Sequence, residues 1–205
     1  MKNMIRLALT LAAYTVVACV GLAFVYNKTE PVIEEAATRE VKAALSIIFP
    51  DASDFDEVTG KIESGNSSIS FDRAYVAKKG DGAVGMVIQV TGPTYKSSTL
   101  LIGIDMNRKI TSVKFTANSD TPGLGSRTAE SPFIDQFPSK SVDDSFKVGS
   151  DIVAISGATI SSKAVSSIIK LTGYKAGEYL ADNYGGKPGD PDAVSTASNN
   201  TPEEE

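Results

Sequence analysis

The stretch LLIGIDMNRKITSVKF, residues 100–115, decides the fold class of this chain. Residues 100–105 form an apolar run, and residues 110–115 alternate between apolar and polar side chains. Both runs are typical of strands, and the short polar segment between them is typical of a turn. Two strands joined by so short a connection pair antiparallel, because a parallel pair needs a long crossover. We therefore predict a hairpin within an antiparallel sheet.

The segments before this hairpin continue the same pattern. Residues 85–90 predict another strand, which the turn residues Gly80-Asp81-Gly82 separate from a weak candidate at residues 75–77. Residues 51–70 are polar and contain glycine and serine, so we expect loops with short strands there.

Helices are expected on both sides of the strands. Residues 30–49 carry apolar side chains at helical spacing, with Pro31 suited to a first turn and Pro50 ending the helix. Residues 160–184 have the same spacing, although Gly173 and Gly177 weaken the middle of the segment. A helix, several sequential strands and a second helix indicate an α+β domain, an antiparallel sheet packed with helices.

The segment between the hairpin and the last helix is less regular. Residues 117–128 predict a Pro/Gly loop, and residues 131–145 leave room for a short helix. Residues 151–155 form a short apolar strand candidate that leads into a turn of small residues.

The N-terminal segment predicts a single transmembrane anchor. Residues 7–26 contain no charge, and as a helix they would span roughly 30 Å, about the hydrocarbon thickness of a bilayer. Lys2 and Arg6 precede them, so the N-terminus is expected in the cytoplasm and the domain on the extracytoplasmic, periplasmic side of the inner membrane. A cleaved signal peptide and a lipoprotein signal at Cys19 are the alternatives, but no small-x-small site follows Tyr26 and the apolar run continues past Cys19.

Three domains follow from this division. Residues 1–26 form the cytoplasmic tip and anchor, residues 27–184 the extracytoplasmic domain, and residues 185–205 an acidic tail expected to be disordered because it lacks periodic apolar residues.

Composition excludes several classes of function. The chain has no histidine, which removes Ser-His-Asp and Cys-His catalytic sets and argues against zinc or haem sites. Its single cysteine, Cys19, lies in the apolar segment, so the domain has no disulfide or thiol nucleophile. Beyond Lys2 and Arg6, 18 basic residues face 25 acidic ones, which argues against a nucleic-acid partner. No metal site is expected, and redox chemistry would require an organic cofactor.

The stretch DIVAISGATISSKAV, residues 151–165, carries the most chemical information. A turn between a strand and a helix exposes backbone N–H groups that no helical carbonyl accepts, beside the positive end of the helix dipole. Gly157 and Ala158 permit close approach to the backbone, while Ser156 and Thr159 offer hydroxyl groups. These features suit a phosphate. An ordinary helix start capped by serine or threonine is the competing interpretation.

This stretch resembles the flavinylation motif of the FMN-binding domain family, in which an aspartate precedes [S/T]-G-A-T by a few residues. Asp151, Ser156, Gly157, Ala158 and Thr159 match the motif in order. The upstream loop Asp120-Thr121-Pro122-Gly123-Leu124-Gly125 is similar to the family's E-T-P-G-L-G, with Asp replacing Glu. One departure is the segment Thr91-Gly92-Pro93-Thr94-Tyr95, where the family often has a Gly/Tyr-rich stretch.

The resemblance implies a cofactor and residue roles. A flavin transferase would join FMN through a phosphoester to Thr159, with Gly157 and Ala158 admitting the phosphate. Ser156, Ser161 or Ser162 would bind that phosphate or cap the helix, and Lys163 would neutralise it or remain solvated. Asp151 would be recognised by the transferase or fix the turn. Contacts to the flavin would come from the upstream loop: Asp120, Thr121, Pro122, Gly123, Leu124 and Gly125.

With its anchor and length, the chain is most similar to the family of Rnf-complex G subunits, and next to the family of C subunits of sodium-translocating NADH:quinone reductase. This implies an electron-transfer component of a membrane-bound ion-translocating oxidoreductase, with other membrane subunits as partners, and not an independent enzyme. A flavin-free structural component, a flavoprotein of another membrane electron chain, and a serine hydrolase using the S-x-x-K of Ser167 to Lys170 are the alternatives; the hydrolase lacks its companion motifs.

Overall fold

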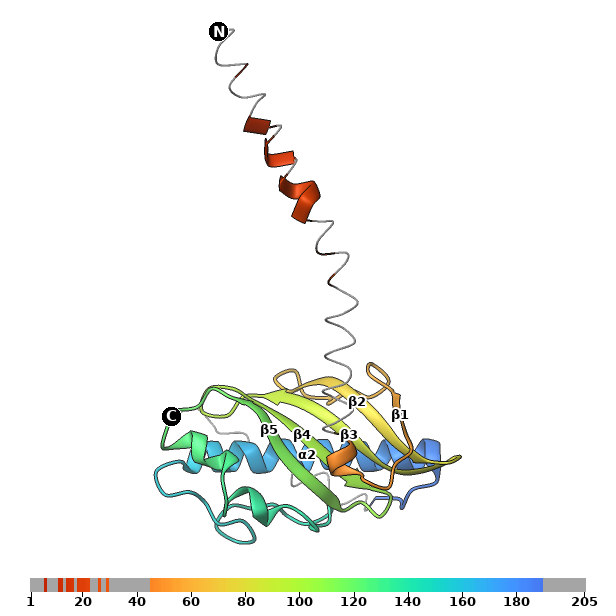
Figure 1. Ribbon diagram of the computed structural model, residues 1–205. Helices are drawn as coiled ribbons and strands as arrows, with labels where there is room; N and C mark the ends of the chain where they lie inside the picture. Colours follow the sequence, from red (N-terminus) through yellow and green to blue (C-terminus); the bar gives the residue numbers. More distant parts are fainter. Residues whose placement is uncertain are drawn as a thin grey trace. The chain divides into compact units, whose positions relative to one another are not determined.

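A computed structural model describes residues 45–189 of the chain continuously, and residues 6, 11–12, 14–16, 18–22, 26 and 29 before them (Figure 1). The chain divides into two compact units, Met1–Ala44 and Leu45–Glu205, and the second contains the sheet. The account below concerns this second unit.

Five strands form one antiparallel sheet in the order of the sequence. They are β1 (Asp54–Glu57), β2 (Ser70–Lys79), β3 (Gly82–Gly92), β4 (Ser98–Asp105) and β5 (Ile110–Asn118). The predicted hairpin is confirmed, with Ile102 opposite Val113 in the register of β4 and β5. Its turn is closed locally, because Asp105 Oδ1 accepts hydrogen bonds from the N–H groups of Asn107 and Lys109.

Helix α2 (Thr159–Tyr184) lies across one face of this sheet and contacts β3 and β4 (Figure 1). Alternate side chains of the strands point to this face, because successive residues of a strand point to opposite sides. The shared core is apolar and includes Met86, Ile88, Val90, Leu100, Ile102, Ile104, Val165, Ile168 and Ile169. The predicted α+β class is therefore confirmed.

The two glycines that weaken α2 on propensity are required by its packing. A Cβ at Gly173 would lie 2.7 Å from Val142 Cγ1, and one at Gly177 would lie 2.5 Å from Arg108 Nη1. The helix therefore runs unbroken past both residues, with its close contacts offsetting the lower helix propensity of glycine.

Between β5 and α2 the chain forms two 3₁₀ helices, η1 (Gly125–Ala129) and η2 (Ile134–Gln136), the second within the stretch expected to hold a short helix. The strand expected at residues 151–155 is wrong. Ile152 makes only an isolated bridge with Val148, and Val153 pairs with a side chain instead of a strand. Gln136 Oε1 accepts from the Val153 N–H at 2.7 Å, and Gln136 Nε2 donates to the Val153 carbonyl at 3.1 Å.

Most of the predicted N-terminal elements lie outside the described residues. No helix among the described residues is long and apolar enough to cross a membrane, and much of segment 7–26 is not described. Of the helix expected at residues 30–49, residues 45–48 are helical, and residues 30–44 lie outside the described part. Of the expected tail, residues 185–189 are described, and the Lys187 N–H bonds the Met106 carbonyl at 3.0 Å.

Candidate functional site

The small-residue turn at residues 156–159 begins helix α2. Gly157 has φ of +79°, in the region that favours glycine, and the Ala158 N–H donates to the Ile155 carbonyl at 3.0 Å. Ala158 is the cap residue and makes no side-chain cap hydrogen bond. Ser156 and Thr159 are both exposed. A helix start capped by serine or threonine, the competing interpretation of this motif, is therefore not what the chain forms.

Ser162 holds this turn from inside the protein. Its side chain is fully buried, and its hydroxyl accepts from the Ile155 N–H at 3.1 Å and donates to the Ala158 carbonyl at 2.9 Å. One hydrogen bond goes to the backbone directly before the motif and the other to the backbone within it. Ser162 therefore stabilises the turn from its buried side.

The second sequence motif, residues 121–125, forms a tight loop after β5. The Thr121 carbonyl accepts from the N–H groups of Leu124 at 3.1 Å and Ser126 at 3.2 Å, and the Gly123 N–H donates to Ser126 Oγ at 2.9 Å. Gly123 has φ of +77°, which this turn requires. Leu124 remains 47% exposed and is not drawn into the core.

The two motifs lie against each other although they are far apart in the sequence. A Cβ added to Gly125 would lie 2.6 Å from Ser161 Oγ, and one added to Gly157 would lie 3.4 Å from Leu124 Cδ2. Gly125 is thus the point at which the loop rests on the first turn of α2. Leu124 extends from this contact toward the small-residue turn.

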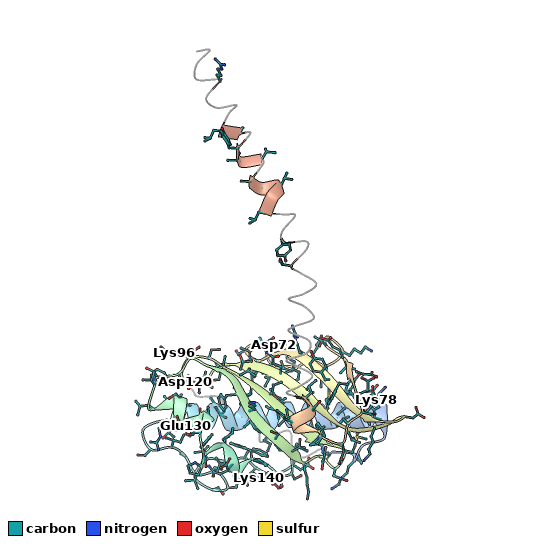
Figure 2. The ribbon with its side chains drawn as sticks, viewed as in Figure 1. Asp72, Lys78, Lys96, Asp120, Glu130 and Lys140 are labelled. Atoms are coloured by element: carbon teal, nitrogen blue, oxygen red, sulfur yellow. The ribbon has the colours of Figure 1, made fainter. Side chains whose placement is uncertain are left out.

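A buried carboxylate joins a third segment to this contact. Asp120 is 3% exposed, and it accepts hydrogen bonds from Thr94 Oγ1 at 2.6 Å, from the Lys96 N–H at 2.7 Å and from Ser161. Burial alone would raise the pKa of Asp120, but the hydrogen bonds from Ser161, Thr94 and the Lys96 and Tyr95 amides outweigh it and lower the pKa. Lys96 and Asp120 lie at one end of the sheet, opposite Lys78 (Figure 2).

A pocket of about 440 Å³ opens where these three segments meet. This volume lies in the usual range for small-molecule sites, roughly 300–1,000 Å³. One wall is apolar and comes from side chains that are about half exposed or more, at Tyr95 (61%), Leu124 (47%) and Ile160 (51%). The rest of the lining comes from the two motifs and the start of α2: Thr121, Gly125, Gly157, Ala158, Thr159 and Ser161.

The structure brings together six of the eleven residues predicted to bind the cofactor. Thr121, Leu124, Gly125, Gly157, Ala158 and Thr159 line the pocket. Asp120 and Ser162 are buried behind it, and Pro122 and Gly123 are exposed in the loop without lining it. Ser156 lines a second pocket, together with Arg127 and Val153.

Two predicted polar residues lie off the pocket. Asp151 is turned inward, where its Oδ2 accepts from the Phe146 N–H at 2.8 Å. Lys163 is exposed on α2 and is not among the lining residues.

Sequence reasoning missed Tyr95 and Ile160 as lining residues. Tyr95 follows Gly92-Pro93, a turn signal shortly before β4, and an aromatic residue in such a turn was the signal available in the sequence. Ile160 follows the motif directly, and helical periodicity did not assign it to the buried face. Ser161 was considered as a phosphate ligand, but its hydrogen bond to Asp120 follows only from the fold.

Two protein families match separate regions of the chain. The family described as the FMN-binding domain matches residues 95–172, which include every residue lining the pocket, and the RnfG N-terminal region matches residues 1–48.

Whole-length relatives give a consistent result. The G subunit of the Na⁺-translocating ferredoxin:NAD⁺ oxidoreductase complex of Acetobacterium woodii is 31% identical over 189 residues, covering 83% of this chain and 90% of the relative. The G subunit of the ion-translocating oxidoreductase complex of Methanosarcina acetivorans is 31% identical, with 80% and 89% covered. The G subunit of the ion-translocating oxidoreductase complex of Escherichia coli is 30% identical, with 85% and 90% covered.

Proposed function

The chain belongs to the G-subunit family of ion-translocating oxidoreductase complexes, and from this premise we propose that it relays electrons within such a complex through an FMN linked by a phosphoester to Thr159. A flavin exchanges one or two electrons and so can connect one-electron and two-electron carriers. The chain's own residues hold, orient and shield the cofactor.

The observation that carries the covalent part of this proposal is the position of Thr159. It is exposed, it is the first residue of α2, and it lines the pocket. The first N–H groups of a helix have no helical carbonyl to bind, and here no side chain of the cap residue occupies them. A phosphate on the Thr159 hydroxyl would therefore lie beside unpaired N–H groups and the positive end of the helix dipole.

The remainder of the pocket suits an isoalloxazine ring. Tyr95, Leu124 and Ile160 expose large apolar surfaces at the pocket. Exposed apolar patches of this kind are typical of binding sites. Gly125 and Gly157 keep the backbone close and leave room beside these side chains. An aromatic ring of the cofactor would cover this surface and remove it from water.

A covalent link has a physical advantage outside the cytoplasm. A noncovalent flavin occupies its site according to its free concentration, whereas a phosphoester removes that dependence. In forming it, the Thr159 Oγ–P bond would replace a P–O bond of a flavin dinucleotide donor. The hydroxyl proton would leave with the departing nucleotide. We propose a flavin transferase as the catalyst of this step.

Intact mass of the full-length chain tests the proposal. The chain is made with and without an active flavin transferase, and we expect a gain equal to FMN less one water only with the transferase. Thr159→Ala should abolish the gain, and Ser156→Ala, which changes a hydroxyl of the same motif outside the pocket, should retain it. An unmodified wild-type mass from a transferase shown to be active on another substrate would refute the link to Thr159.

The topology is proposed on the sequence alone. Residues 7–26 would contact membrane lipid as a single-pass anchor with the N-terminus in the cytoplasm, and the FMN-binding domain would lie on the extracytoplasmic side with the other membrane subunits of an Rnf-like complex as partners. A Cys19→Ala chain carrying Asp182→Cys on the exposed surface of α2 tests this. A membrane-impermeant maleimide should label it in intact spheroplasts; labelling only after lysis would contradict the topology.

A further inference from the structure

The aspartate of the flavinylation motif is partly buried and bonded to the backbone of a neighbouring loop. Asp151 Oδ1 is buried and has no hydrogen-bond partner among the described residues, and Oδ2 accepts from the Phe146 N–H at 2.8 Å. One oxygen is thus hidden from a partner protein, and the other is engaged by the backbone. The geometry therefore favours a role for Asp151 inside the fold.

A buried lysine approaches the same peptide group from the other side. Lys170 is 2% exposed and lies on α2 about three turns after Thr159. Its Nζ is 3.5 Å from the Ser145 carbonyl, which belongs to the same peptide bond as the Phe146 N–H. Asp151 and Lys170 thus hold the two polar groups of one peptide bond. The ammonium group of Lys170 is also attracted by the carboxylates of Asp151, Asp143 and Asp144.

The peptide bond held in this way sits at a strained position. Phe146 has φ of +53°, in a region that bulky side chains rarely adopt. Its ring is 1% exposed and stacks on Phe137 with centroids 6.1 Å apart. A strained backbone position thus coincides with a ring packed in the core, and Asp151 and Lys170 bond the peptide at this position.

One compact loop connects the kink at Phe146 to the segment that leads into the small-residue turn. Directly after Phe146, the Lys147 carbonyl accepts from the N–H groups of Asp151 and Ile152. The Gly149 N–H bonds the Ile152 carbonyl at 2.8 Å, and this closes a compact loop. The loop ends at Val153, the residue bound by Gln136, and the motif begins three residues later at Ser156.

We propose that Asp151 and Lys170 form a buried ionic clasp on the Ser145–Phe146 peptide that positions the turn at residues 156–159 for attachment of the flavin. The effect of the clasp on flavin attachment rests on the proposed function, whereas the clasp itself does not. Asp151 and Lys170 are positioning residues: they act through the loop and touch neither Thr159 nor the pocket. Lys170 lies outside the motif, which makes it a new requirement for flavinylation.

The flavinylation rate of the full-length chain tests the consequence. Asp151→Asn keeps an oxygen for the Phe146 N–H but removes one of the carboxylate charges that act on Lys170, beside those of Asp143 and Asp144. Lys170→Met removes the ammonium charge. Each change should lower the maximal rate roughly 10- to 100-fold, as for a small displacement of a reacting group, with little change in the chain concentration at half-maximal rate. The double variant should react faster than Asp151→Asn, because it no longer buries an ammonium group that has lost one of its compensating carboxylates. Asp182→Asn, an exposed carboxylate on the same helix, is the matched control.

Hydrogen exchange of the chain without flavin tests the clasp independently of any flavin chemistry. Both single variants should raise amide exchange at residues 146–158 relative to β3 and β4, and the double variant should lie closer to wild type. Wild-type exchange in both single variants would overturn the clasp even in a chain that binds flavin normally. Unchanged exchange together with a raised half-maximal concentration in Asp151→Asn would mean direct reading by the transferase. If the wild-type chain takes no flavin, the proposed function fails and exchange alone decides the clasp.

Discussion

Replacing Gly125 by alanine tests whether the contact between the loop and α2 builds the pocket. The added Cβ would lie 2.6 Å from Ser161 Oγ, 2.7 Å from Asp120 Cβ and 2.8 Å from Asp120 Oδ2. Contacts this short require movement. Asp120 cannot yield easily, because it is buried and held by hydrogen bonds from the β3–β4 connection. We expect the loop and the helix to move apart.

The size of the effect follows from two contributions. Overpacking a buried position destabilises by about 1–3 kcal/mol. Separating Ser161 from the ionised carboxylate weakens a charged hydrogen bond of about 1.5–3 kcal/mol. Movement of the loop away from the helix relieves the overpacking but weakens the hydrogen bond, so the two costs do not add in full. We expect the free energy of unfolding to fall by about 2–4 kcal/mol. For a domain of this size, that is a fall in Tm of roughly 5–15 °C.

Thermal unfolding and flavinylation of the same samples provide the assay. Gly123→Ala is the matched control: its φ of +77° makes alanine strained by about 1–2 kcal/mol, but nothing lies within 4 Å of the added Cβ. We expect Gly123→Ala to accept flavin and Gly125→Ala to lose at least about nine-tenths of its flavinylation rate, as misplacement of the site implies. If Gly125→Ala were no less stable than Gly123→Ala and accepted flavin equally, the role assigned to this contact would be refuted.

Three further changes separate the parts of the site. Asp120→Asn should destabilise the domain by about 1–3 kcal/mol at neutral pH. Folding lowers the pKa of Asp120, so its carboxylate stabilises the domain fully above the unfolded pKa of about 3.9. This stabilisation disappears as the pH falls through the still lower folded pKa. Acid titration of unfolding should therefore show the wild-type and Asp120→Asn stabilities converging only below about pH 4. Ser162→Ala should reduce stability by about 1–3 kcal/mol, measured by denaturant unfolding, because the buried Ile155 N–H loses its acceptor; an unchanged midpoint would contradict its role in the turn. Tyr95→Ala should leave Tm unchanged because the ring is 61% exposed, yet it should alter the visible absorbance of the bound flavin, and an unchanged spectrum would exclude Tyr95 from the flavin site.

The local elements of the fold were predictable because short-range chemistry determines them. The hairpin at residues 100–115 has its own closing residue in Asp105, which bonds two N–H groups of the turn within four residues. Helix α2 was predicted within one residue of its observed start, because its apolar spacing persists over many turns. The weak strand candidate at residues 75–77 proved to be the centre of the longer β2, whose outer residues carry little apolar signal.

The error at residues 151–155 has the opposite cause. The run is apolar, as a strand would be, but its backbone is satisfied by the side chain of Gln136, a partner that no local pattern reveals. The position of Asp151 was hidden for the same reason. Its spacing before the motif could be read from the sequence, whereas its hydrogen bond with the Phe146 N–H depends on the closure of the intervening loop.

By itself, the sequence determined the α+β class and contained the two motifs of the site, and the resemblance of these motifs to the FMN-binding domain family made Thr159 the predicted flavin carrier. The fold class depends on periodicity and turn chemistry, which operate over a few neighbouring residues. Only the tertiary structure decided which members of the motifs face the pocket, because this depends on the packing of segments distant in the sequence. Asp120 meets Ser161, Leu124 meets Gly157, and Lys170 reaches the loop of Asp151 only after the sheet and α2 have buried their common core.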